Sequence, residues 1–135
     1  MGLAERRAAD RWKNNDYPDW KTRIDQAVGF DIPVEVAWEQ LASEGNPEYY
    51  DEWFPKVYFQ PLTMALSAIT IDDMGKEAIR DGLTKIVVKN SGEYSSASGF
   101  SFSGGVLTIN HKPQTNVDYP EERAKAIQKM LEDAL

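Results

Sequence analysis

The stretch SGFSFSGGVLTINH, residues 98–111, constrains the fold of this chain more than any other. Its two consecutive glycines, Gly104 and Gly105, can both adopt the positive φ angles that a two-residue hairpin turn requires. Pairing outward from this turn predicts the apolar pairs Phe102–Leu107 and Phe100–Ile109 and the polar pairs Ser101–Thr108 and Gly99–Asn110. A shift by one residue would exchange the core face and the solvent face, so the pattern predicts one register and one buried face.

Two further segments show the apolar–polar alternation that is typical of a half-buried strand. Residues 30–36 alternate strictly, and Pro33 within them favours a place at the edge of a sheet, where a missing N–H is tolerated. Residues 84–90, TKIVVKN, precede the hairpin, so we predict a β-meander over residues 84–113. Both a sheet that includes strand 30–36 and one that leaves it apart fit the sequence.

Helical periodicity and helix-start residues account for most of the remaining chain. Residues 1–29 are expected to form an N-terminal helical hairpin that ends at Gly29. Residues 118–135 are the clearest helix, because Asp118 and Glu121 have the spacing of a capping box and a proline follows the first of them. Further helices are expected over residues 37–44, after Asn46-Pro47, after Pro61 and over residues 73–82.

The predicted fold class is α+β. We expect an antiparallel sheet of three or four strands, with one face covered by helices and with more helix than strand, in a single domain of residues 1–135. A chain of 135 residues with 41% hydrophobic residues can form one core. The chain has no cysteine, which suits a reducing compartment, and neither a secretory signal nor a run long enough to span a bilayer is evident. We therefore expect a cytoplasmic protein.

The negative charge is concentrated in one part of the chain. The net charge is −7, and residues 31–55 carry seven acids but no lysine or arginine: Asp31, Glu35, Glu39, Glu44, Glu48, Asp51 and Glu52. Such a field repels nucleic-acid phosphates and anionic membranes and attracts basic surfaces. We therefore expect a basic protein partner, and neither nucleic acid nor membrane. The alternative is that the acidic excess only keeps the protein soluble.

The acidic region contains the stretch YYDEWFPKVYF, residues 49–59, with six aromatic residues in eleven positions. Pro55 and Pro61 are expected to divide it into short helical pieces. Within one such piece the aromatic side chains fall on different sides, so they cannot all face the core. We expect Trp53, Phe54 and Phe59 in the core and Tyr49, Tyr50 and Tyr58 partly exposed. The alternative is that all six pack between helices.

Tyrosines among acidic residues are typical of protein interfaces, because the rings anchor a partner and the charges steer it. The candidate partner-binding residues are Glu39, Glu44, Glu48, Tyr49, Tyr50, Asp51, Glu52 and Tyr58. In size, acidity and lack of cysteine the chain resembles bacterial immunity or inhibitor proteins that neutralise cationic nuclease toxins. That resemblance implies a non-enzymatic protein that binds a basic toxin. A homodimeric accessory protein, in which two copies bury the same aromatic residues, is an alternative.

His111 is the only histidine and the only candidate for catalysis. The hairpin register pairs it with Ser98, at the rim of the buried face, where packing and hydrogen bonding explain it most simply. The alternative is a small enzyme in which His111 acts as a general acid or base with Asp118 or Tyr119. This alternative expects a cavity between the sheet rim and the C-terminal helix.

No motif for nucleophilic catalysis, nucleotide binding or zinc binding occurs in the chain, and we expect no cofactor and no metal. Asp72, Asp73 and Glu77 have carboxylates that suit Ca²⁺ or Mg²⁺. The first two are better explained as helix-capping residues of the segment that follows.

Overall fold

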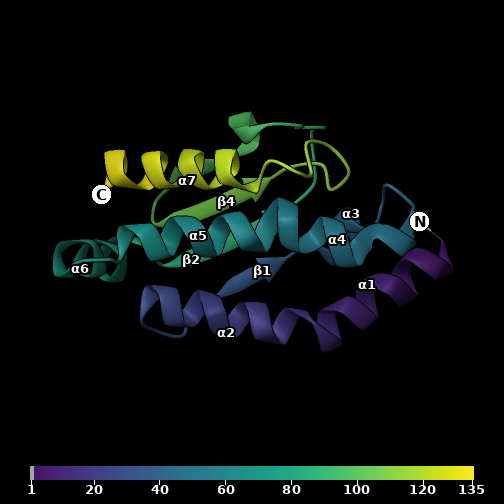
Figure 1. Cartoon of the computed structure of the whole chain (residues 1–135), viewed down its shortest axis with the longest axis horizontal. Coiled ribbons are helices and arrows are strands. Elements are labelled where there is room, and N and C mark those ends of the chain that lie inside the picture. The colour runs from purple at the N-terminus through teal and green to yellow at the C-terminus, as the bar shows by residue number, and fades with distance from the viewer. Residues whose placement is uncertain (1) are drawn as a thin grey trace.

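The structure, a computed structural model, describes residues 2–135 as a four-stranded sheet with helices against one face (Figure 1). The strands are β1 (Val34–Val36), β2 (Lys85–Lys89), β3 (Ser101–Ser103) and β4 (Val106–Asn110). The helices are α1 (Leu3–Asn15), α2 (Tyr17–Val28), α3 (Trp38–Leu41), η1 (Pro47–Tyr49), α4 (Tyr50–Phe54), η2 (Pro55–Phe59), α5 (Gln60–Ile69), α6 (Asp73–Gly82), η3 (Ala97–Gly99) and α7 (Pro120–Ala134). Helix exceeds strand, and the predicted α+β class is confirmed.

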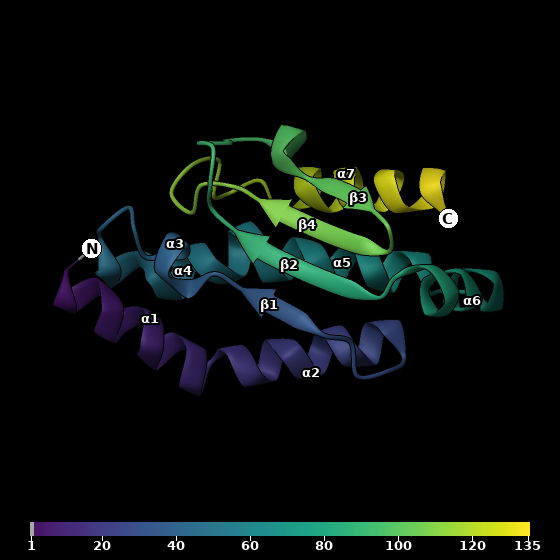
Figure 2. The same cartoon turned by 180° about the vertical axis from the view of Figure 1, so that it is seen from behind.

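The sheet is mixed and mostly parallel, so the predicted antiparallel sheet was wrong. The strand order is β1-β2-β4-β3, and only β3 and β4 are antiparallel (Figure 2). Residues 84–113 therefore do not form a meander, because β4 lies between β2 and β3. β4 contributes the fully buried Leu107 and Ile109, whereas β3 contributes one half-buried side chain, Phe102. The more apolar strand takes the central place, where both of its neighbours exclude water.

The hairpin itself was predicted correctly. Phe102 pairs with Leu107 and Ser101 with Thr108, and the turn glycines have φ angles of 58° and 81°. The ladder begins at Ser101, so the predicted pairs of Phe100 and Gly99 lie outside it. β1 is shorter than the predicted strand 30–36. It joins the same sheet through β2, at the edge, as the proline before it indicates.

The first two helices run end to end with a bend between them (Figures 1 and 2). They do not fold back on each other, as the helical hairpin expected for residues 1–29 would require. Only Asp16 separates them, and its backbone angles stay close to helical values (φ −106°, ψ −41°). One nearly helical residue is too short a loop to reverse the chain. α2 ends at Gly29 in the left-handed conformation (φ 87°), as predicted.

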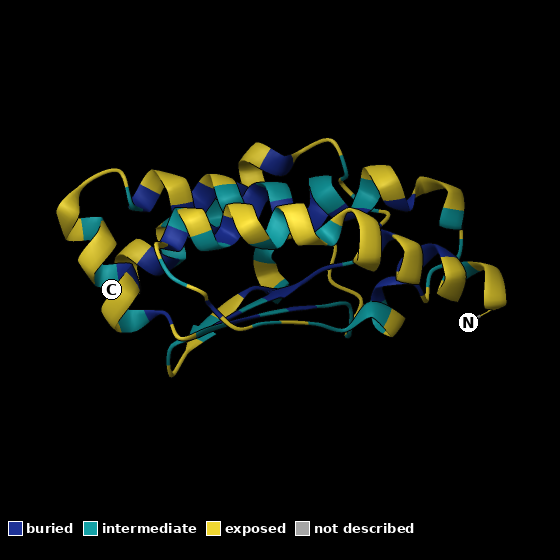
Figure 3. Cartoon of the chain, turned by 90° about the horizontal axis from the view of Figure 1, so that it is seen from below, coloured by how far each residue is buried: buried dark blue, intermediate teal, exposed yellow. Residues whose placement is uncertain are grey.

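The helices α2, α5 and α7 cover one face of the sheet, and the opposite face is uncovered (Figure 3). This confirms the expectation that helices cover only one face. The core between the two layers contains Ile24 of α2, Leu62 and Leu66 of α5, Ile127 of α7, Ile86 of β2 and Leu107 of β4. None of the helices in residues 2–135 combines the length and the apolar character that crossing a bilayer requires.

The chain is helical without interruption from Pro47 to Ile69, so the predicted division at Pro55 and Pro61 was wrong. Between the two prolines the chain forms a π-helical segment, η2. In it the N–H of Gln60 bonds to the carbonyl of Pro55, five residues back. By the same spacing Pro61 would bond to the carbonyl of Lys56, but it has no N–H. Arg123 of α7 donates to that carbonyl instead, through Nη2 at 3.0 Å.

The start of α7 also differs from the prediction. The helix begins at Pro120 after Tyr119, and no side chain caps its first turn, so the expected capping box of Asp118 and Glu121 is not formed. Asp118 instead accepts a hydrogen bond from Lys56, 3.2 Å away. The C-terminal helix expected over residues 118–135 is present over Pro120–Ala134.

Candidate functional site

Two of the three tyrosines expected to be partly exposed are buried. The exposed fraction of Tyr50 is 1% and that of Tyr58 is 0%, so the prediction was wrong for both. The Tyr50 hydroxyl donates to the carbonyl of Ala42 at 3.0 Å, and the Tyr58 hydroxyl donates to the carbonyl of His111. Burial raises the pKa of Tyr50 to about 12 and that of Tyr58 well above its usual value. Because each hydroxyl has a main-chain partner, it can lie in the interior.

The crowded rings are accommodated because other elements supply aromatic partners. Trp12 of α1 lies with its ring centroid 5.4 Å from that of Phe54 and 5.4 Å from that of Phe59. Trp38 of α3 contacts the same two phenylalanines. Phe54 and Phe59 are therefore core residues, as predicted, and Trp53 is half-buried. The segment therefore packs against α1 and α3 as well as against the main core, so more of its rings are buried than one helix face could hold.

The exposed part of the stretch is a group of four residues on η1 and α4 that we call the acidic surface: Glu48, Tyr49, Asp51 and Glu52. Tyr49 has 48% of its surface exposed, and its ring stacks on Trp53 with the centroids 5.3 Å apart. Within residues 2–135 only Glu52 of the three acids forms an ion pair, with Lys56 at 3.1 Å. The surface therefore presents an aromatic ring beside carboxylates, two of which have no ion-pair partner there.

Glu44, another predicted contact residue, has a structural use. Its Oε1 accepts a hydrogen bond from Asn90 at 3.3 Å, and its Oε2 accepts one from Gln114 at 3.3 Å. The side chain thereby joins the loop after α3 to the segments after β2 and β4. Glu44 is half-buried, and its hydrogen-bond partners do not belong to the acidic surface.

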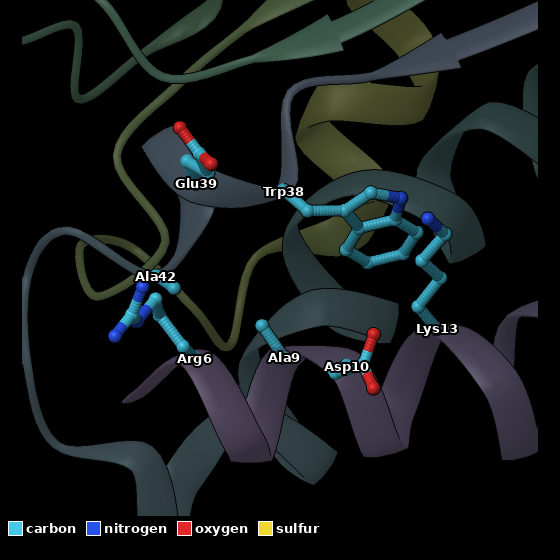
Figure 4. Close-up of a pocket in the computed structure, with 7 residues that line it drawn as sticks. All are labelled: Arg6, Ala9, Asp10, Lys13, Trp38, Glu39 and Ala42. Atoms are coloured by element: carbon cyan, nitrogen blue, oxygen red, sulfur yellow. The ribbon is translucent and has the colours of Figure 1, made fainter. Parts of the chain in front are cut away.

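Glu39, the remaining predicted contact residue, is exposed and lines a cavity of about 210 Å³ between α1 and α3 (Figure 4). Arg6 and Lys13 stand at opposite ends of this cavity, and Asp10 also lines it. The two cations and two carboxylates balance each other. The lining of this cavity therefore has no net charge that would select an anion or a cation.

A larger cavity, about 580 Å³, lies beside His111 and is lined by Ser95, Ser96, Ala97, His111, Asn116, Tyr119, Glu122 and Arg123. These residues come from the segment between β2 and β3, the loop between β4 and α7, and the first turn of α7. The parallel strands β1, β2 and β4 bring their carboxyl ends to the same edge of the sheet, which is where open α/β sheets bind ligands. The enzyme alternative expected a cavity in this place.

The imidazole of His111 is nevertheless fully buried in the cavity wall. Its Nδ1 lies 2.6 Å from the carbonyl of Lys112, so the Nδ1–H donates there, and Nε2 has no hydrogen-bond partner. Burial lowers the pKa of His111, and the charge of Arg123 lowers it further. Tyr119, one of its two predicted partners, lines the cavity, while Asp118 is paired with Lys56. A buried neutral imidazole is poorly placed to exchange a proton with a ligand.

Only His111 and Tyr119 of the lining residues were predicted from the sequence, and the most important of the others is Arg123. It is 4% exposed, and its guanidinium donates to the carbonyls of Asn116 at 2.6 Å, Lys56 at 3.0 Å and Val117 at 3.2 Å. Within residues 2–135 it has no carboxylate at ion-pair distance, and burial lowers its pKa. A signal existed: Arg123 lies four residues before Ile127, on the apolar face of α7.

Of the three possible metal ligands near α6, Asp72 caps the helix and Glu77 pairs with Arg80. Asp72 is the N-cap of α6, and its Oδ1 accepts a hydrogen bond from the N–H of Gly75 at 2.8 Å, as predicted. Among residues 2–135, no three histidine, aspartate or glutamate side chains are grouped so that they could hold a metal ion.

Comparisons of this chain with protein families, with curated proteins and with solved structures returned no match.

Proposed function

We propose that this protein is a non-enzymatic acidic interaction domain that binds a basic protein through the acidic surface. The observation that carries the proposal is the exposure of Tyr49, which stacks on Trp53 between carboxylates. A tyrosine held by a neighbouring ring loses little conformational freedom when it is covered by a partner. Glu48 and Asp51, which lack ion-pair partners among residues 2–135, supply the charge that attracts a basic surface.

The acidic surface lies on a helix whose other side is buried in the core. Tyr50 and Phe54, on the same helix as Asp51 and Glu52, are buried with ring centroids 4.6 Å apart and nearly parallel planes. A surface fixed to the core in this way presents its anchor in one orientation, which favours specific association. The class of protein that fits these properties is an immunity or inhibitor type that neutralises a basic partner such as a toxin, and the cytoplasm is the compartment we propose for it.

The partner would be identified first by capture from the native host with the purified chain, followed by mass spectrometry for a stoichiometric basic protein. Association kinetics with that protein then test the surface. We expect Asp51→Lys to slow association several-fold, because it reverses a steering charge, and added salt to slow it likewise. Tyr49→Ala should weaken binding about tenfold to thirtyfold, mainly through faster dissociation.

The matched control is Glu132→Lys, which makes the same charge reversal on α7, toward the opposite end of the molecule (Figure 1). Binding that is independent of salt, or that responds equally to the Asp51 and Glu132 variants, would contradict the proposal. Light scattering of the purified chain tests the alternative: a doubled mass that Tyr49→Ala abolishes would assign the same surface to a homodimer.

A further inference from the structure

The buried polar atoms that lack a hydrogen-bond partner are concentrated in one segment. Within residues 2–135 the side-chain atoms of this kind are Nε2 of His111, Oγ1 of Thr115 and Nε of Arg123. His111 and Arg123 both line the 580 Å³ cavity at the carboxyl ends of the strands. Buried polar groups are normally paired, so the unpaired Nε–H of Arg123 in the cavity wall points to a binding role. Nε2 of His111 carries no proton when Nδ1–H donates to Lys112, so it is an acceptor and does not itself attract an anion.

Among residues 2–135 no carboxylate lies at ion-pair distance from the guanidinium of Arg123, although Glu121 and Glu122 act on its charge from farther away. Its two terminal nitrogens donate to main-chain carbonyls, and the bond to Lys56 is explained by the missing N–H of Pro61. These bonds do not account for Nε, and no carboxylate within residues 2–135 pairs with the guanidinium. The N-terminus of α7, which begins three residues earlier, adds a partial positive charge. A buried cation without a counter-charge is unfavourable, and an anion beside it would relieve that cost.

The same cavity supplies neutral donors. Ser95 and Tyr119 line it, both are exposed, and neither hydroxyl has a hydrogen-bond partner among residues 2–135. Asn116 also lines it, and its side-chain amide donates to the carbonyl of Ser95, which holds the two sides of the opening together. The volume exceeds that of a bare anion and matches the size of small-molecule sites.

We propose that this cavity binds the oxyanion group, phosphate or carboxylate, of a small molecule, with Arg123 as the charge and the hydroxyls of Ser95 and Tyr119 as donors. Glu122 also lines the cavity and opposes an anion. Its carboxylate therefore lowers the affinity, and its removal gives a sharp test. The inference is independent of the protein-binding surface on η1 and α4, so either can fail without the other.

The single histidine is a built-in reporter, because His111 lines the cavity and gives one imidazole signal in an NMR spectrum. The experiment titrates the full chain with inorganic phosphate, with acetate and, as the ionic-strength control, with chloride. We expect a saturable shift of the His111 Cε1–H signal with phosphate or acetate and none with chloride. The two active arms separate a phosphate site from a carboxylate site. No saturable shift with either anion would overturn the proposal.

Three variants localise the site. Glu122→Gln should tighten anion binding about two- to fivefold, because it removes a repulsive charge at the cavity. Glu121→Gln is the matched control, since it removes the same charge from the neighbouring, exposed residue that does not line the cavity. Arg123→Gln should weaken binding about tenfold or more. If the Arg123 variant does not fold, the proposal is tested by comparing anion binding in the two glutamate variants. Equal effects of Glu122→Gln and Glu121→Gln on anion affinity would overturn it.

Discussion

Tyr58 of the π-helical segment carries a wholly interior hydroxyl that donates to the main-chain carbonyl of His111, the residue after β4. Tyr58→Phe keeps the ring but leaves that buried carbonyl without this donor. We expect the free energy of unfolding to fall by about 1–3 kcal/mol, measured by urea denaturation with an unchanged m-value. The control is Tyr94→Phe at an exposed tyrosine, which should change stability little. Equal losses in the two variants would contradict the role assigned to the buried hydroxyl.

His111 makes stability depend on pH. Burial holds its pKa in the folded protein below the ordinary value of 6.5, so the unfolded chain binds the proton more readily. The contribution of His111 to stability is therefore fully present above pH 6.5 and is lost as the pH falls through 6.5 toward the folded pKa. We expect the free energy of unfolding to decrease with falling pH, with a slope from this one group of at most about 1.4 kcal/mol per pH unit. The measurement is urea denaturation between neutral pH and the onset of carboxylate titration, with His111→Gln as the variant that should flatten the slope. A slope unchanged in that variant would refute the assignment.

At the scale of elements, the turn between α5 and α6 depends on a glycine within the helix. A Cβ atom at Gly75 would lie 1.7 Å from the carbonyl oxygen of Ile69, which is main chain and cannot move aside cheaply. We expect Gly75→Ala to lower the free energy of unfolding by about 1–3 kcal/mol through overpacking. Gly82→Ala in the same helix is the control, since its Cβ would meet only the side chain of the terminal Leu135, and it should change stability by less than about 0.5 kcal/mol. Thermal or urea unfolding of both variants checks the difference, and a neutral Gly75→Ala would show that the turn is not packed as described.

At the scale of the whole molecule, the strand order makes a prediction for hydrogen exchange. β2 and β4 are central and β3 lies at the edge, so amides of β4 should exchange more slowly than those of β3. In a meander β3 would be central and the order of protection would be reversed. Residue-resolved exchange by NMR, with the fully buried Ile109 and the edge residue Ser103 as reporters, distinguishes the two topologies.

The amino-acid sequence alone determined the features that depend on near neighbours. The hairpin register follows from two adjacent glycines and a two-residue alternation, and the end of α2 follows from Gly29. The acidic character of residues 31–55 is likewise a property of composition, and Glu48, Tyr49, Asp51 and Glu52 do reach the surface.

Only the tertiary structure decided what depends on partners far away in the chain. Phe54 is interior because α1 and α3 bring Trp12 and Trp38 beside it, and Tyr50 is interior because its hydroxyl reaches the carbonyl of Ala42 after α3. At Pro61 the helix continues with the help of Arg123, more than sixty residues away, which bonds to the carbonyl that Pro61 leaves free. The parallel sheet arose in the same way, because burial favours the more apolar β4 beside β2, and local pattern does not specify which strand lies next to which. Burial and hydrogen-bond satisfaction are properties of the whole packed chain, which is why these features could not be derived from segments taken one at a time.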